Sequence, residues 1–199
     1  EKSYYIYLPV LEKELDNMAR YTLDMVLEYA KVFPENADMG NMDGPQWQQQ
    51  IAMKGGQYVV NAYFTNQEQI DKLMMDGFKA TVMGNPRIQE GNADFGIGKY
   101  MKIKRGVADD IRDWIDPVTK ENVNLGGPVK VVDLRQGKEE VRKWSFSEDG
   151  ELGNGTRAKV QFETYADGNG IRLNGIAVTE LVERTSEPSE DDMIFAAAV

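Results

Sequence analysis

The sequence predicts a mainly β protein, a small and partly open antiparallel barrel of five to six strands with one clear helix. Several stretches alternate apolar and polar residues at period two, which is typical of half-buried strands. Helical patterns do not alternate with these strands, and this disfavours an α/β sheet. The last two strands are joined by the short segment 166–170, ADGNG, which suits a hairpin turn.

The first predicted strand covers residues 20–33. Its apolar side chains share one face at period two: Tyr21, Leu23, Met25, Leu27, Tyr29 and Phe33. Residues 34–56 are rich in Asn, Asp, Gly and Gln, so we expect a long surface loop that could include a turn of helix near 47–53. The second strand follows at 56–64.

The clearest helix begins after the second strand. Asn66 is placed as its N-cap, Ile70, Leu73 and Met74 fall on one helical face, and Gly77 ends it. A loop containing Gly84, Pro86 and Gly91 leads to the third strand, 95–106. Residues 109–127 are connecting material, 129–134 is a short strand, and two longer strands at 156–165 and 171–183 close the domain. We therefore expect an N-terminal arm or short helix at 1–19, one domain at 20–183 and an acidic tail at 184–199.

Composition excludes several kinds of chemistry. The 199 residues include no Cys and no His, which removes disulfides, thiolate zinc sites, Cys or His nucleophiles and histidine acid/base catalysis. We expect no cofactor and no enzymatic activity. No apolar run approaches the roughly 18 residues of a membrane helix, and the start lacks the pattern of a signal peptide, so we expect a cytoplasmic protein without membrane contact.

The net charge of −10 disfavours nucleic acid only if it is spread evenly. Residues 180–199 hold six acidic residues against one basic residue, and residues 1–19 hold four acidic against two basic. The 160 residues between them carry a net charge of only −3. The body of the protein is therefore nearly balanced.

The third strand separates into two faces. Phe95, Ile97, Met101 and Ile103 point one way, with Lys99 interrupting, and Arg105 ends the run. The other face presents Gly96, Gly98, Tyr100, Lys102 and Lys104. Such a face suits single-stranded nucleic acid, because a base stacks on the ring with about 1–3 kcal/mol and lysines hold the phosphates. An ordinary solvated strand face is the alternative.

Two further strands repeat this arrangement. In 156–165, Ala158, Val160, Phe162 and Thr164 point inward, which leaves Arg157, Lys159, Gln161, Glu163 and Tyr165 on the other face. In 56–64 the polar face carries Gln57, Asn61 and Tyr63, with Lys54 just before the strand. The predicted contacts with single-stranded DNA are Lys54, Tyr63, Lys99, Tyr100, Lys102, Lys104, Arg105, Arg157, Lys159 and Tyr165.

The sequence gives weaker signals for other kinds of binding site. Asp109, Asp110 and Asp113 could hold a divalent metal, as in a nuclease, but Arg112 stands among them and a solvated face is the simpler interpretation. We expect no metal site. Trp47, Trp114, Trp144 and Phe146 suit core or loop packing as well as base platforms.

Three motifs resemble the single-stranded-DNA-binding proteins of T7-like and related phages. They are VVDLRQGKEEV from Val131, ELGNGTRAKVQFETY from Glu151, and IRLNGIAVTELVE from Ile171, followed by an acidic end. Upstream, KGGQYVVNAYFTN resembles the strand of that family in which a basic residue and Gly precede a Tyr. The likeness covers residues 54–66 and 129–195 loosely.

The resemblance implies an OB-fold and non-catalytic, largely sequence-independent binding of single-stranded DNA in phage replication and recombination, in the host cytoplasm. It implies a stacking role for Tyr165 and a backbone contact for Lys54. It also implies that the tail binds phage replication proteins, competes with DNA for the groove, or supports a homodimer. A phage structural or small-ligand-binding β-barrel is the alternative.

The tail itself mixes charge and apolar side chains. Glu187, Glu190, Asp191 and Asp192 would imitate phosphates, and Met193, Ile194 and Phe195 would imitate bases, so we expect the segment to occupy the DNA groove or a partner protein. A tail that only keeps the protein in solution is the alternative.

Overall fold

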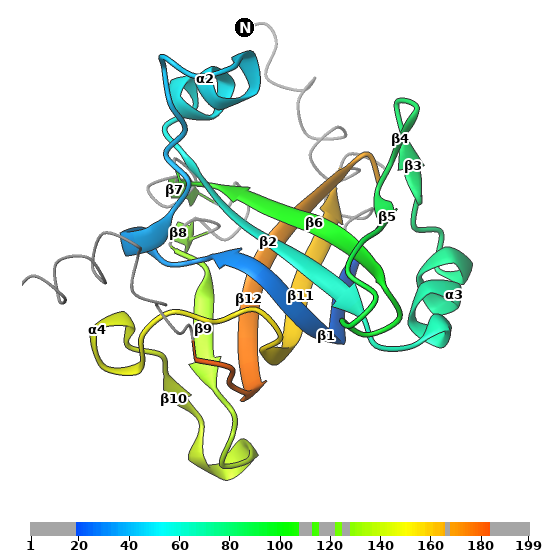
Figure 1. Cartoon of the computed structure of the whole chain (residues 1–199), viewed down its shortest axis with the longest axis vertical. Coiled ribbons are helices and arrows are strands. Elements are labelled where there is room, and N and C mark those ends of the chain that lie inside the picture. Colours follow the sequence, from blue (N-terminus) through cyan, green and yellow to red (C-terminus); the bar gives the residue numbers. More distant parts are fainter. Residues whose placement is uncertain (1–18, 108–112, 116–121, 125–127, 166–167, 184–199) are drawn as a thin grey trace, which may run out of the picture.

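The computed structural model describes residues 19–107, 113–115, 122–124, 128–165 and 168–183. Its centre is an eight-stranded mixed sheet with the strand order β10-β9-β12-β11-β1-β2-β6-β5 (Figure 1). The strands of this sheet are β1 (Arg20–Lys31), β2 (Gln57–Phe64), β5 (Ile88–Glu90), β6 (Lys99–Gly106), β9 (Lys130–Asp133), β10 (Arg142–Lys143), β11 (Arg157–Tyr165) and β12 (Gly170–Glu180). The prediction of a mainly β protein is confirmed.

The predicted antiparallel barrel of five to six strands needs two corrections, because the sheet has eight strands and one of its pairs is parallel. β9 and β12 pair in parallel, with Val131 opposite Ile176, because the chain between them crosses over through β10 and β11. β6 and β12 approach within 8 Å between Cα atoms, but no strand pairing joins them in the part of the chain that the structure describes. The sheet therefore curls without closing.

A bulge in β1 overturns part of the predicted apolar face. Met25 and Leu27 are buried as expected, but Tyr29 is 66% exposed and has a φ of 50°. The register with β2 shifts between Glu28 and Lys31, so that Ala30 and Val32 become the buried residues beyond the bulge. An extra residue in one strand reverses the alternation of faces, and this is why period two fails at Tyr29.

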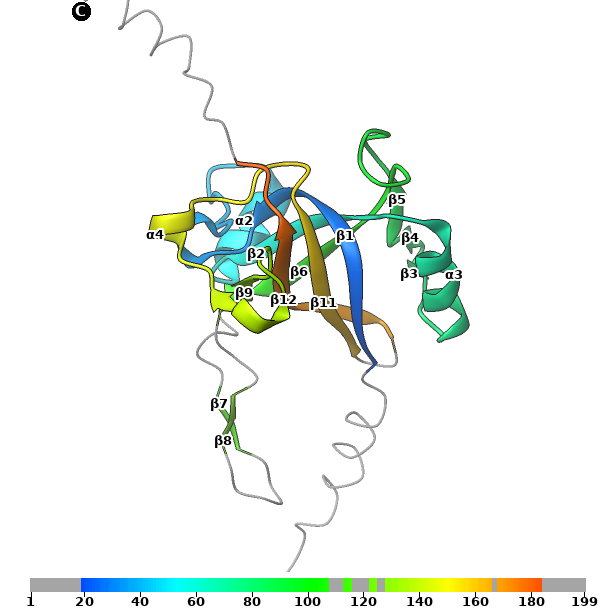
Figure 2. The ribbon, with the colours of Figure 1, turned by 90° about the horizontal axis from the view of Figure 1, so that it is seen from below.

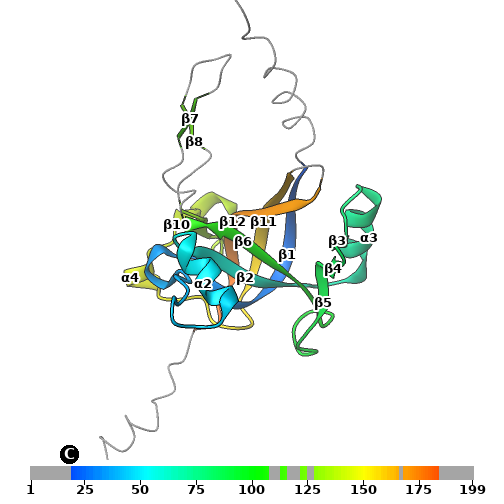
Figure 3. The same ribbon diagram turned by 90° about the horizontal axis from the view of Figure 1, so that it is seen from above.

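The helices are short and lie outside the sheet: η1 (Pro34–Asn36), α2 (Gln46–Met53), α3 (Gln67–Met75), η3 (Lys138–Glu140) and α4 (Phe146–Asp149). α2 and α3 lie at opposite ends of β2 (Figures 1 and 3). The helical turn expected near 47–53 is confirmed as α2. None of the described helices has the length and apolar character needed to cross a membrane.

The capping of α3 is confirmed, because the Asn66 side chain accepts a hydrogen bond from the backbone N–H of Gln69. Ile70 and Leu73 are buried. Met74, expected on the same face, is 46% exposed. α3 packs against the end of β2 through Ile70 and Leu73, and its Gln69 side chain donates a hydrogen bond to the backbone oxygen of Asp24 in β1.

The segment before β6 is a turn, not the predicted start of a strand. Gly96 and Gly98 have φ values of 55° and 71°, which glycine adopts readily and a strand does not. A Cβ at Gly96 would lie 2.0 Å from the backbone oxygen of Phe64, which also accepts a hydrogen bond from the N–H of Ile97. This close approach holds the turn against the end of β2.

Two small hairpins lie beside the sheet. β3 (Thr81–Val82) pairs with β4 (Asn85–Pro86) in the predicted loop, and β7 (Asp113–Ile115) pairs with β8 (Asn122–Asn124) apart from the main sheet (Figure 2).

The expected arm, apart from Ala19, and the expected tail lie outside the described residues.

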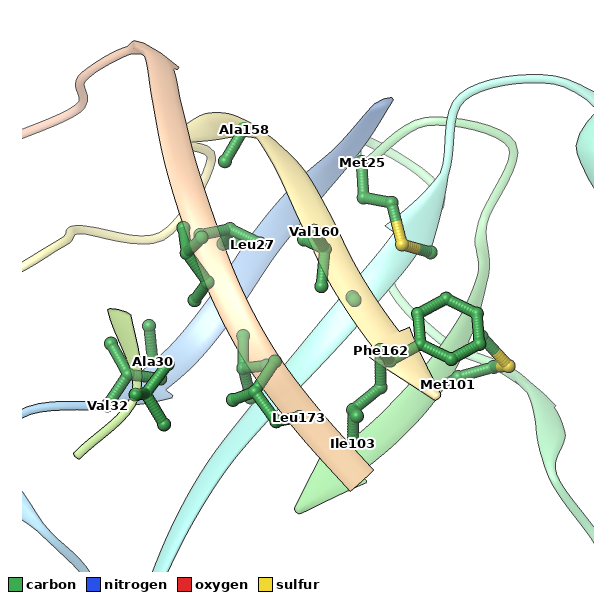
Figure 4. Packing of buried hydrophobic residues seen from close by; sticks show 14 of the residues in the cluster. Met25, Leu27, Ala30, Val32, Met101, Ile103, Ala158, Val160, Phe162 and Leu173 are labelled. Atoms are coloured by element: carbon green, nitrogen blue, oxygen red, sulfur yellow. The ribbon is translucent and has the colours of Figure 1, made fainter. Parts of the chain in front are cut away.

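The core fills the inside of the curled sheet. Side chains from β1, β6, β11 and β12 point toward one another there, among them Leu27, Ile103, Val160, Phe162 and Leu173 (Figure 4). The inward residues predicted for β11 are confirmed, since Ala158, Val160, Phe162 and Thr164 are all buried, while Glu163 on the other face is buried as well. Apolar groups fill the inner face of the sheet. Side chains that could bind a ligand therefore lie on the outer face or at the open gap between β6 and β12.

Candidate nucleic-acid interface

A pocket of about 660 Å³ lies where β6 and β12 approach without pairing. α2 and the turn after it form one wall, the end of β6 forms a second, and the β11–β12 hairpin forms the third. The lining residues are Trp47, Gln50, Ile51, Lys54, Gly56, Gln57, Lys104, Arg105, Gly106, Glu163, Tyr165, Ile171 and Arg172. The pocket therefore joins three elements that are far apart in the sequence.

Four cationic side chains line this pocket, namely Lys54, Lys104, Arg105 and Arg172, against the single carboxylate of Glu163. Burial lowers the pKa of the Lys104 ammonium, and the nearby ammonium groups of Lys102 and Lys54 lower it further, while Asp38 opposes them. The ammonium groups of Lys54, Lys102 and Lys104 thus lie close enough to repel one another. An anion that entered the pocket would relieve this repulsion.

Two aromatic side chains stand at the pocket with much of their surface open. Trp47 is 59% exposed and Tyr165 is 45% exposed. The Tyr165 ring lies against the backbone of Gly170, its partner in the β11–β12 register. A Cβ at Gly170 would come 2.2 Å from the ring atom Cζ, so this ring position requires glycine opposite it.

Arg105 is buried at the end of β6. The sequence predicts it as a DNA contact at the end of the third strand, and the structure leaves it only 6% exposed. On β6 it follows Met101 and Ile103 at period two, so its side chain enters the inner face at the mouth of the curled sheet. It lines the pocket from the inner side of the sheet.

Glu163 is the acidic exception in the pocket and is 5% exposed. Its Oε2 accepts a hydrogen bond from the Asn174 side-chain amide at 2.9 Å and lies 3.5 Å from the guanidinium of Arg20. The register places Arg172 directly opposite Glu163. The carboxylate is therefore held in a fixed position on the same face of β11 as Tyr165.

A second aromatic cluster lies at the other end of β2 and β6. The Tyr63 ring lies 5.1 Å from that of Tyr100 and 5.4 Å from that of Phe95. The Tyr63 hydroxyl donates to Glu28 at 3.0 Å and accepts from the N–H of Asn92 at 3.0 Å, and burial raises its pKa. Tyr63 is 1% exposed, so the expectation of a surface ring is wrong.

Tyr100 is half-buried, and its hydroxyl donates to the side chain of Gln89 at 2.9 Å. Lys99, also half-buried, begins β6 next to this cluster. Lys102 lies exposed between the cluster and the pocket. These three residues share β6 with Lys104 but do not line the pocket.

The two predicted cations of β11 are engaged elsewhere. The Lys159 ammonium lies 2.7 Å from Asp24, and the Arg157 guanidinium lies 3.5 Å from Glu180. Of the ten predicted contacts, the pocket thus gathers Lys54, Lys104, Arg105 and Tyr165.

Sequence reasoning missed Trp47 and Arg172 as members of the pocket. The sequence does not decide between packing and stacking for Trp47, and it assigns no face to the strand that contains Arg172. The predicted tail residues Glu190, Asp191, Asp192 and Phe195, together with Asp109 and Asp110, lie outside the described residues, as does the side chain of Asp113.

No known family model matches the chain, and comparison with curated proteins finds no relative. The functional interpretation therefore depends on the chemistry of the pocket.

Proposed function

We propose that the protein binds single-stranded DNA largely without sequence specificity, as a non-enzymatic protein of phage DNA replication and recombination. The observation that carries the proposal is one pocket that combines four cationic side chains with two exposed aromatic rings. Cations hold the phosphate backbone of a single strand, and aromatic rings stack its bases whatever their identity.

The order of the strands supports an OB-type fold for this function. The series β6-β2-β1-β11-β12 consists of antiparallel neighbours, so β6 and β12 run in the same direction across the open gap. OB-folds are five-stranded, partly open barrels that bind oligonucleotides with the loops after their first and fourth strands. Here those connections are the α2 segment and the β11–β12 turn, beside which Trp47, Lys54 and Tyr165 lie.

The proposal is tested by fluorescence-anisotropy titration of labelled oligo-dT at low and moderate salt. We expect affinity to fall steeply with salt, because each phosphate contact on a single strand contributes about −0.7 to the slope of log K against log salt. Lys104→Ala should weaken binding and make the slope shallower by about that amount. Tyr165→Ala should weaken binding by about 1–3 kcal/mol with little change in slope.

Arg157→Ala is the matched control, because this cation lies on the same sheet outside the pocket and pairs with Glu180. Its effect should be small. Absence of binding by the full chain, with none recovered after removal of residues 184–199, would contradict the proposal and favour a structural or small-ligand-binding β-barrel.

A further inference from the structure

The carboxylate of Glu163 has no role in holding a phosphate backbone. It lies in a pocket with four cations, and an ionised carboxylate repels phosphate. It is also 5% exposed, and its contacts with Asn174 and Arg20 hold it there. An acceptor in this position can attract only the hydrogen-bond donors of a ligand.

The hairpin places this acceptor next to the stacking ring. Glu163 and Tyr165 are two residues apart on one face of β11, which separates their Cα atoms by roughly 7 Å. Gly170 and Arg172 occupy the facing positions of β12. A base stacked on Tyr165 would therefore direct one edge along the strand toward Glu163.

The carboxylate is also oriented before any ligand arrives. The hydrogen bonds from Asn174 and from Arg20 reach the same oxygen, Oε2. They orient the carboxylate, while its side chain lines the pocket. A fixed acceptor discriminates between donors and acceptors on a base edge more sharply than a mobile one.

We propose that Glu163 is a specificity-determining residue, and that it favours bases carrying an exocyclic amino group over thymine or uracil at the position stacked on Tyr165. This inference rests on the proposed single-stranded-DNA function. Cytosine presents an N4 amino donor where thymine and uracil present an O4 acceptor, which the carboxylate repels. One such position in the bound strand produces a preference within otherwise sequence-independent binding.

The test compares oligo-dC with oligo-dU of equal length by anisotropy, because the two bases differ chiefly in the group at position 4. The full-length protein should bind oligo-dC at least about fivefold more tightly. Glu163→Gln should bring the ratio of affinities close to one, because an amide offers both a donor and an acceptor. Glu180→Gln, an exposed acid of β12 outside the pocket, should keep the wild-type ratio.

A second arm needs no variant and so does not depend on the folding of Glu163→Gln. Oligo-dC made with N4,N4-dimethylcytosine lacks the amino donors and should bind the wild-type protein as weakly as oligo-dU. Equal affinity for oligo-dC and oligo-dU, or a ratio that survives in Glu163→Gln, would overturn the inference and leave the proposed function intact. If neither oligonucleotide binds, both proposals fail.

Discussion

Gly170 acts on the candidate site through the ring that lies against it. Its φ is not in the left-handed region, so an alanine there is not strained by the backbone. The obstacle is the Tyr165 ring, since the new Cβ would come within 2.2–2.6 Å of three ring atoms. Gly170→Ala must therefore displace the ring from the position that opens it to the pocket.

We predict that Gly170→Ala weakens oligo-dT binding by an amount similar to Tyr165→Ala, about 1–3 kcal/mol. In the double variant the two losses should not add, because both remove the same stacking contact. Anisotropy titration of the four proteins measures this. Full additivity would show that Gly170 does not act through Tyr165.

The environment of a single residue can be predicted from the sequence where the alternation of strand faces alone decides whether its side chain is buried. The faces of β11 follow from period two, and this places Tyr165 on the outside correctly. The same rule placed Tyr63 at the surface, but the chain at 92–98 folds over it, with Asn92 bonded to its hydroxyl. A loop that covers a strand face leaves no periodic signal in the strand itself.

At the scale of elements, one carboxylate links β9, β10 and α4. Asp133 accepts hydrogen bonds from the backbone N–H, Nε and guanidinium NH2 of Arg135 at 2.8–3.0 Å, and from Arg142 at 2.9 Å. Arg142 also pairs with Asp149 of α4, and Arg135 lies over the Trp144 ring at 5.4 Å. The bonds from Arg135 hold the pKa of Asp133 well below its usual range.

This network predicts a pH-dependent stability. Because the folded pKa of Asp133 lies below the unfolded value of about 3.9, its contribution is complete above that pH and is lost as pH falls toward the folded pKa. Asp133→Asn should lower the free energy of unfolding by about 2–3 kcal/mol at neutral pH. The difference between variant and wild type should shrink below about pH 4.

Urea denaturation at a series of pH values measures this difference. Asp24→Asn is a suitable control, because the Asp24–Lys159 pair is exposed and should contribute less than about 1 kcal/mol. A difference for Asp133→Asn that persists unchanged at pH 2 would show that packing, not ionisation, explains the loss.

Element positions and the β11–β12 hairpin are largely predictable from this sequence, while the pairing of strands that are distant in the chain is not. Alternation and turn residues locate β2, β11 and β12 and the cap of α3, since each signal is local. The parallel pairing of β9 with β12 depends on the path of the intervening chain, and the Tyr29 bulge has no glycine to mark it. The pocket was only partly foreseen for the same reason, because Trp47 and Arg172 meet there through tertiary folding.

At the scale of the whole molecule, the pocket spans the unpaired gap between β6 and β12. Lys104 and Arg105 lie on one side of the gap, and Tyr165 and Arg172 on the other. A strand of DNA that contacts both sides adds a connection that the backbone hydrogen bonds do not make. Binding should therefore oppose local opening of the sheet at this gap.

We predict that saturating oligo-dT slows amide hydrogen exchange in β6 and at the start of β12 more than in β9 and β10. At about 100 times Kd the bound protein should gain about 2.7 kcal/mol of stability, which also raises Tm by several degrees. Hydrogen exchange followed by mass spectrometry locates the effect. Protection confined to β9 and β10 would place the DNA elsewhere on the molecule.

The position of β1 in the sheet has a bearing on biosynthesis. β1 lies between β2 and β11, and its partner Glu163 is 143 positions after Arg20. While a ribosome has delivered only β1, β2 and β6, the other edge of β1 keeps its N–H and C=O groups unpaired. Such an edge is a template for pairing with other chains. The nascent protein therefore remains vulnerable to misassembly until translation has passed β11, and slow elongation through residues 107–156 would prolong that exposure.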